Sequence, residues 1–455
     1  MLHRHDSRAG QDSSRGPAVA QEPPAGAGAS RRVGFVNDSC RIRNSALAAA
    51  RPLRAPRIPI LAPNFGFPSH TQELHLEKTL IAGACAAALF APLAHAQSSV
   101  TLYGLIDAGI AYTNNVNGAS QWRMATGTIN GSRFGLRGTE DLGGGLKALF
   151  VLENGFNANN GGLGQDGKLF GRHAYVGLSQ AGYGTLTLGR QYDTMVDFVA
   201  PLSATSGDFG DTGFAHPFDN DNLNHSLRIN NAVKYTSDTI AGFKVGALYA
   251  FSNSANFSAN RAYSVAASYT NGPLKLAGAY LQMNGTKGST SASPGATDSA
   301  EAKSLNQGGW SIGSDRMRSY GGGVSYVFGP ATVGFVYTRS QYDNTGAFGS
   351  SGQIAFNNYD VNVRYAVTPA VSVGAAYVYT DASVSNPDSK HGSDPKWHQA
   401  NLQAVYKLSR RTDLYAEAMF QHASGRGYQA FINTSGGASS TANQVVGTIG
   451  MRTRF

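Results

Sequence analysis

Cysteine is almost absent from this 455-residue chain. Its two cysteines, Cys40 and Cys85, both lie within the first 96 residues. The portion after residue 96 has no thiol and can form no disulfide, which is compatible with an oxidising compartment.

Long hydrophobic runs are also missing from the later chain. No segment after residue 96 approaches the ~20 consecutive apolar residues of a membrane-spanning helix. If this part of the chain crosses a membrane, it does so without helices.

Recognisable catalytic and metal-binding motifs are missing as well. An enzyme would need a Ser or Asp nucleophile beside a positioned histidine, but the histidines are scattered. After residue 96 they are His173, His216, His225, His391, His398 and His422. The run 219–222 (DNDN) resembles the start of a calcium loop, yet Asn224 and Asn230 stand where the EF-hand pattern requires Gly and Glu. We therefore predict neither an enzyme nor a metal or other cofactor.

Charge is sparse and unevenly distributed. Asp, Glu, Lys and Arg make up 14% of the chain, and the formal net charge is +9. The first 96 residues hold 11 basic and six acidic residues, so they supply more than half of this excess. The basic residues of the later chain form no patch with aromatics, which argues against a nucleic-acid partner.

The leading segment contains an export signal. Lys78 precedes an apolar run over 79–93, and Ala94-His95-Ala96 places small residues at a cleavage site before Gln97. This is the pattern of a secretory signal peptide over 74–96. Residues 1–73 are rich in Arg, Ala, Pro and Gly without periodicity, so we expect an extension that is disordered or lies upstream of the true translation start.

From residue 97 onward, apolar and polar residues alternate with a period of two. Over 359–368, for example, the apolar Tyr359, Val361 and Val363 alternate with Asp360 and Asn362. Such a period indicates strands with one apolar and one polar face.

The connections between these strands alternate between short and long. Turn residues mark seven short connections at 141–145, 182–184, 237–242, 271–273, 329–330, 368–370 and 409–412. Eight longer polar connections fall around 113–130, 155–170, 191–228, 252–260, 284–316, 341–357, 381–396 and 423–443. Fifteen connections join 16 strands, and short turns on one side with long loops on the other are typical of an outer-membrane β-barrel. The predicted fold is all-β, a closed 16-stranded antiparallel transmembrane barrel spanning 97–455.

Five segments resemble the general porins of Gram-negative proteobacteria. They are SVTLYG at 99–104, SRFGLRG at 132–138, EDLGGGLK at 140–147, LTLGRQYD at 186–193 and the terminal RF at 454–455. The resemblance covers the signal and 97–455. It implies a homotrimer in the bacterial outer membrane, a long third loop folded into each lumen, and a C-terminal Phe455 that the outer-membrane assembly machinery reads.

The candidate pore-lining residues come from strand alternation and from this resemblance. Alternation points Arg133, Arg137, Glu153 and Lys234 into the lumen, together with Arg228. In the resembled family, arginines at the positions of Arg133, Arg172 and Arg228 face the carboxylates of the third loop, with an acid at the position of Glu153. Arg172 is expected on the resemblance alone, because its alternation with Val176 and Leu178 predicts an outward side chain.

The third loop, 192–227, contains six aspartates and no Lys or Arg. Asp208 and Asp211 lie in its middle and are the candidates for its side of the constriction. The sequence thus predicts a water-filled channel for passive diffusion of small hydrophilic solutes and ions, with a weak preference for anions. A substrate-preferring channel and a non-conducting structural barrel or adhesin remain alternatives.

Overall fold

The computed structural model describes residues 99–205, 212–285 and 312–455. They belong to one compact unit, Pro92–Phe455. The predicted cleavage site at Ala96 and Gln97, the signal and the leading extension lie outside the described residues. No helix in the described part of the chain is long and apolar enough to cross a membrane.

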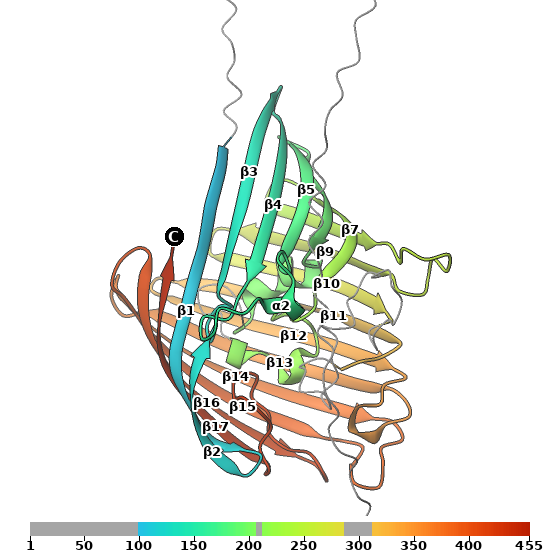
Figure 1. Cartoon of the computed structure of the whole chain (residues 1–455), viewed down its shortest axis with the longest axis vertical. Coiled ribbons are helices and arrows are strands. Elements are labelled where there is room, and N and C mark those ends of the chain that lie inside the picture. Colours follow the sequence, from blue (N-terminus) through green and yellow to red (C-terminus); the bar gives the residue numbers. More distant parts are fainter. Residues whose placement is uncertain (1–98, 206–211, 286–311) are drawn as a thin grey trace, which may run out of the picture. The chain divides into compact units, whose positions relative to one another are not determined.

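The architecture is all-β, and every neighbouring pair of strands is antiparallel (Figure 1). The strands of the first half are β1 (Ser99–Val116), β2 (Ala119–Thr126), β3 (Arg133–Gly143), β4 (Leu146–Gly155), β5 (His173–Gln180), β6 (Gly184–Gln191), β7 (Ile229–Thr236) and β8 (Phe243–Ala250). Those of the second half are β9 (Ala262–Asn271), β10 (Leu274–Asn284), β11 (Arg316–Phe328), β12 (Ala331–Asp343), β13 (Ile354–Ala366), β14 (Val371–Val384), β15 (Lys396–Lys407), β16 (Thr412–Ser424) and β17 (Asn443–Arg454).

These segments form a closed barrel of 16 wall strands. The last strand, β17, pairs with β1 from Leu105↔Arg454 to Thr113↔Val446 and closes the wall. Both β2 and β3 pair with β1, so together they form one wall strand that is interrupted at 127–132. Closure leaves no open strand edge, and in lipid each unpaired backbone group at such an edge would cost several kcal/mol. The predicted 16-stranded barrel is confirmed.

One predicted long connection is wrong. The sequence predicts a loop over about 113–130, but β1 continues to Val116 and a tight turn leads directly into β2. Asn117 and Gly118 have φ angles of 52° and 101°, the left-handed conformation that two-residue hairpin turns require. The irregular segment comes later, where Asp107 accepts hydrogen bonds from the backbone N–H groups of Ile129 and Asn130 at 3.0 and 2.9 Å.

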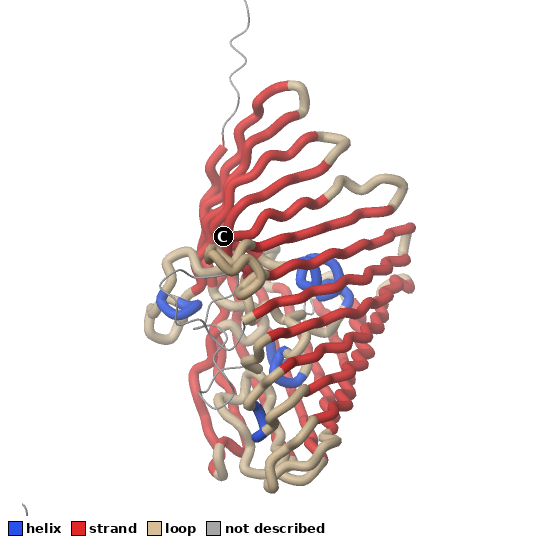
Figure 2. Tube along the Cα trace, turned by 90° about the vertical axis from the view of Figure 1, so that its right-hand side faces the viewer, coloured by secondary structure: helices blue, strands red, loops and turns tan. Residues whose placement is uncertain are grey.

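The two faces of the wall differ as alternation predicts. On β13, Val361 and Val363 are exposed on the outer face, whereas Asn358 and Asp360 are completely buried on the inner face. The buried apolar cluster lies between the inner wall and the third long connection. Met195 and Leu223 of that connection join Leu281 of β10 and Met317 of β11 in one cluster. Figure 2 shows the strands of the wall in red and the helical turns in blue.

Candidate constriction site

The third long connection, between β6 and β7, packs against the inner wall. Its described part contains η1 (Met195–Val199), η2 (Ala200–Leu202), η3 (Thr212–Phe214) and η4 (Pro217–Asp219). The turns η1 and η2 contact β9 to β12. Met195 of η1 is buried, and so is Phe218 of η4, which packs on Phe356 of β13 and Trp397 of β15. The hydrophobic effect therefore holds the connection inside the barrel.

Polar contacts attach this connection to β12 and β13. Asp221 Oδ2 accepts a hydrogen bond from Thr338 Oγ1 at 2.5 Å and lies 2.6 Å from His216 Nδ1. The Asn220 side chain bonds Ser340 Oγ at 2.5 Å and Asn358 Nδ2 at 2.8 Å. All six residues are buried. Together they fix the connection at 216–221 against the wall.

His216 and Asp221 form a buried ion pair. Burial alone would lower the pKa of His216, but Asp221 and Asp360 raise it to about 10. Burial alone would raise the pKa of Asp221, but the facing imidazolium and its hydrogen bond hold this pKa below the ordinary value. The two charges cancel at short range, so this acid contributes little net charge to the channel.

The other described aspartates of the connection are also engaged within the fold. Burial, with the charge of Asp221, raises the pKa of Asp219 to about 7, and burial raises that of Asp193 to about 6. Asp197 forms an ion pair with Lys234, with Nζ and Oδ2 2.7 Å apart. These three acids therefore add little free negative charge to the lumen. The predicted Asp208 and Asp211 lie outside the described residues.

A cluster of basic and aromatic side chains lies where β1, β3, β4 and β5 meet the third connection. Arg172 donates from Nε to Glu153 Oε1 and from Nη2 to the Tyr192 hydroxyl, both at 2.6 Å. The Tyr103 hydroxyl donates to Glu153 Oε2 at 2.9 Å. Arg133 Nη1 lies 4.0 Å from Glu153 Oε1. Glu153 is thus the shared partner of two arginines and a tyrosine.

Tyr192 joins a third arginine to this cluster. The guanidinium of Arg228 lies 5.8 Å from the centre of the Tyr192 ring, and that of Arg172 lies 5.9 Å from it. The imidazole of His225 stacks on the same ring with centroids 5.0 Å apart. Burial, with the positive charges of Arg172, Arg228 and Arg133, holds the pKa of His225 well below its ordinary value, so the stacked ring is neutral. We call Arg133, Arg172, Arg228, Glu153 and Tyr192 the basic cluster.

The basic cluster has an excess of positive charge. Its three arginines face one carboxylate, which leaves a formal charge of +2. Arg172 is only 2% exposed and is held in place, whereas the Arg133 side chain retains 20% exposure. Of the two arginines beside Glu153, Arg133 is therefore the one that is better placed to meet a passing solute.

The structure brings together four of the predicted residues and separates two others from them. Arg133, Arg172, Arg228 and Glu153 lie in the basic cluster. Arg137 is exposed further along β3, with its guanidinium 5.2 Å from the centre of the Tyr103 ring. Lys234 donates to the Tyr192 carbonyl at 3.0 Å in addition to its ion pair with Asp197.

The outward orientation that alternation predicts for Arg172 is wrong. Strand β5 begins only at His173, and the chain bends at Gly171 and Arg172. Alternation does not extend through such a bend, so Arg172 turns inward and is buried. Tyr192 and His225 lie outside regular strands, where alternation gives a side chain no direction. Tyr103 lies on β1 with the parity of the buried Asp107, so alternation is the signal that could have found it.

Within the described ranges, no group of three or more His, Cys, Asp or Glu side chains could hold a metal ion. The side chains of 219–222, considered above as a calcium loop, bond instead to the loop and the wall. Asp219 accepts from the backbone of Asn224 at 2.9 Å and Ser226 at 3.0 Å.

Comparison with known proteins identifies the family. Residues 83–426 match the family model described as Gram-negative porin. The chain belongs to this porin family. The porin is 34% identical over 385 residues to an outer membrane porin protein of Bordetella pertussis, covering 75% of this chain and 93% of that protein. It is also 32% identical to outer membrane porin protein 32 of Delftia acidovorans, covering 84% of this chain and all of that one.

Solved structures agree with this assignment. The structure of an anion-selective porin from Comamonas acidovorans matches with a TM-score of 0.63 and 26% identity, covering 79% of this chain and all of that one. OmpT of Vibrio cholerae matches with a TM-score of 0.54 and 19% identity, which supports the fold alone. The protein is a porin of the bacterial outer membrane, and it is a channel and not an enzyme.

Proposed function

We propose that this porin lets small hydrophilic solutes and ions diffuse passively through a water-filled lumen, with a weak preference for anions set by the basic cluster. The observation that carries the proposal is the imbalance of charge at this site. Arg133, Arg172 and Arg228 oppose a single carboxylate, that of Glu153. Asp197, Asp219 and Asp221 are engaged elsewhere and do not balance them.

The expected selectivity is graded. Two unit charges about 6 Å apart in a wet pore, with an effective dielectric between those of water and protein, interact by about 1–2 kcal/mol. One unopposed charge therefore biases permeation by roughly tenfold. The anion selectivity named for the Comamonas acidovorans structure supports the same sign.

The loop side of the constriction is part of the proposal. We propose that Asp208 and Asp211 contribute carboxylates on the loop side that partly offset the wall arginines, and that Arg137 and Lys234 line the lumen at its margins. With Arg137, four wall arginines then face the three carboxylates of Glu153, Asp208 and Asp211, so an excess of positive charge remains. Because Asp197 already neutralises Lys234, we expect Arg133 to affect selectivity more than Lys234.

The proposed assembly follows from the family resemblance. The porin acts as a homotrimer surrounded by outer-membrane lipid, after export by the 74–96 signal and cleavage between Ala96 and Gln97. Phe455 is the proposed recognition residue for the assembly machinery. Its backbone exchanges two hydrogen bonds of 3.0 Å with Gly104, and its ring is 45% exposed.

Solute uptake into liposomes tests the function. The porin is reconstituted, and uptake rates are compared for anionic, cationic and neutral solutes of matched size. We expect anions to enter fastest and Arg133→Ala to reduce this advantage by severalfold. The matched control is Arg316→Ala, because Arg316 is exposed at the start of β11 and alternates with the buried, inward Met317, so it lies on the outer face. An equal effect of both substitutions would contradict the role of Arg133.

The same assay separates the general channel from a substrate-preferring one. A general channel predicts that the uptake of neutral sugars falls smoothly with solute size. Saturation by a single solute would instead favour the substrate-preferring channel, and no uptake by folded protein would favour a structural barrel or adhesin.

A further inference from the structure

A cavity whose lining includes no residue of the basic cluster lies at the end of the barrel that carries the long connections. Its volume is about 560 Å³, within the range of ~300–1,000 Å³ typical of small-molecule pockets. It is lined by Asn117, Phe218, Phe348, His391, Trp397, Gly427, Tyr428, Gln429, Phe431, Asn433, Gly436, Gly437 and Ala438. We call it the vestibule pocket. It is built where four long connections and the β1–β2 turn meet.

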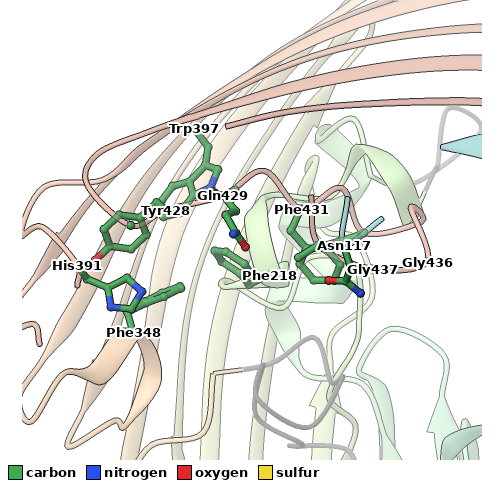
Figure 3. A pocket seen from close by; sticks show the side chains of 13 residues that line it. Asn117, Phe218, Phe348, His391, Trp397, Tyr428, Gln429, Phe431, Gly436 and Gly437 are labelled. Carbon is green, nitrogen blue, oxygen red and sulfur yellow. Dashed lines mark hydrogen bonds between the residues drawn. The ribbon is translucent and has the colours of Figure 1, made fainter. Parts of the chain in front are cut away.

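Aromatic rings dominate the lining of the vestibule pocket. Phe218 of the third connection packs on Phe348 at 5.6 Å and on Trp397 at 5.4 Å between ring centroids. Tyr428 closes the group, with its ring 5.1 Å from Phe348 and 5.7 Å from Trp397. Figure 3 shows His391, Phe348 and Tyr428 at one side of the pocket, Phe431 and Asn117 at the other, and Phe218 and Gln429 between them.

The rings are fixed before any ligand enters. The Tyr428 hydroxyl donates to the Gly392 carbonyl at 2.8 Å, and Trp397 Nε1 donates to the Gln429 carbonyl at 3.4 Å. Because the polar atoms of both rings are bonded to backbone, these side chains lose little freedom on binding. A preorganised aromatic lining favours a flat, ring-containing ligand.

Asn433 gives the pocket a polar specificity. Its side chain is 2% exposed, and neither Nδ2 nor Oδ1 reaches a hydrogen-bond partner within the described protein. A buried amide with both its donor and its acceptor unmatched is unfavourable unless a bound molecule matches them. Both atoms are shielded in this conformation, so the Asn433 amide must first turn toward the cavity. A ligand group that offers one acceptor and one donor side by side would then satisfy both atoms.

The charge of the lining narrows the ligand class further. Among the described residues, the lining contains no Asp, Glu, Lys or Arg. The imidazole of His391 lies at the edge of the pocket. Its Nδ1 bonds Asp388 Oδ1 at 2.7 Å, so this nitrogen is directed to a partner outside the lining. A charged ligand would lose hydration without gaining an opposite charge, so a neutral ligand is favoured.

We infer that the vestibule pocket binds neutral aromatic solutes that carry an amide-type donor and acceptor edge, with the ring on the Phe218, Phe348 and Phe431 side chains and the edge on Asn433. Such binding places the solute at the mouth of the lumen and does not depend on the charge preference proposed for the basic cluster.

Benzamide is the probe, because it combines a planar ring with one amide. Binding to the folded porin purified from outer membranes is measured by ligand-observed NMR titration, with no conduction required. We expect saturable binding of benzamide. Toluene, which lacks the amide, and cyclohexanecarboxamide, which lacks the aromatic ring, should each bind about tenfold more weakly or not at all.

Asn433→Leu tests the polar contact, because leucine is of similar size and offers no hydrogen bond. We expect about a tenfold loss of benzamide affinity. The matched control is Asn401→Leu, since Asn401 is also buried with an unbonded Nδ2 but lies outside the pocket. The comparison of the three ligands on the wild-type protein tests the inference even if Asn433→Leu does not fold.

Three results would overturn the inference. Folded wild-type porin could show no saturable benzamide binding, cyclohexanecarboxamide or glucose could bind as tightly as benzamide, or Asn433→Leu could bind benzamide like the wild type. Equal binding of glucose would indicate a carbohydrate site in place of an aromatic one.

Discussion

The attachment of the third connection to the wall makes a quantitative prediction about Asp221. The Asp221→Asn substitution keeps the shape of the side chain but removes one charge of the buried pair with His216. Removing one partner of a buried ion pair costs about 3–5 kcal/mol. We expect the lower end, about 3 kcal/mol, because the remaining His216 can lose its proton. Release of the connection from the wall should then become about a hundredfold more frequent.

Hydrogen exchange measured by mass spectrometry tests this prediction. Amides over 212–228 should exchange faster in Asp221→Asn than in the wild type, while strands β12 and β13 remain protected. Larger current fluctuations in single channels should accompany the change. The matched control is Asp388→Asn, because Asp388 also pairs with a histidine, His391 at 2.7 Å, but is exposed. We expect no measurable change from it.

The anchoring argument would be refuted if Asp221→Asn showed wild-type exchange over 212–228. It would also be refuted if Asp388→Asn produced an equal change, because the effect would then not depend on burial.

Three further predictions concern the same fold. The folded-state pKa of His216 is raised to about 10, so the stabilisation from its ion pair with Asp221 is complete below about pH 6.5 and is lost as the pH rises through about 10. Amide hydrogen exchange over 212–228 should therefore accelerate between these two pH values. Asp413→Asn should lower the temperature at which the barrel unfolds in detergent electrophoresis, because Asp413 bonds both the buried Arg452 at 3.2 Å and Arg454 at 2.7 Å; an unchanged temperature would contradict this. Deletion of Phe455 should reduce folded porin in cellular outer membranes but not refolding in detergent, and equal loss in both would indicate a structural role.

The barrel wall could be predicted from the sequence because its physical cause is local. Each wall strand places one face toward lipid and one toward the lumen, so a period of two appears at 359–368 and in the last strand. Turn residues at positions such as Gly329 then mark the strand ends, and the count of 16 follows from the connections. The Asn117-Gly118 pair is a turn signal too, but the polar residues on both sides of it equally favour one long loop.

The constriction could be predicted only in part, because its geometry depends on contacts between distant segments. Arg133 and Glu153 lie on regular strands, so alternation alone predicts the direction of their side chains. Arg172 lies at a bend, where alternation does not apply, and the resemblance alone indicated its place.

The role of the loop acids was the least accessible from the sequence. Asp219 and Asp221 look like free negative charges in the sequence, yet they bond backbone amides, Thr338 and His216. Their partners lie as far as 117 positions away in the chain, and no local pattern reveals such a pairing.

The reversal potential of the wild-type porin in a planar bilayer tests the central claim most directly. Under a tenfold potassium chloride gradient, an ideally selective channel would reach about 59 mV. The uncompensated arginines of the basic cluster predict a potential of the sign for anion preference, well below that limit, that approaches zero in Arg133→Ala. A potential of the sign for cation preference, or an anion preference that Arg133→Ala leaves unchanged, would contradict the account.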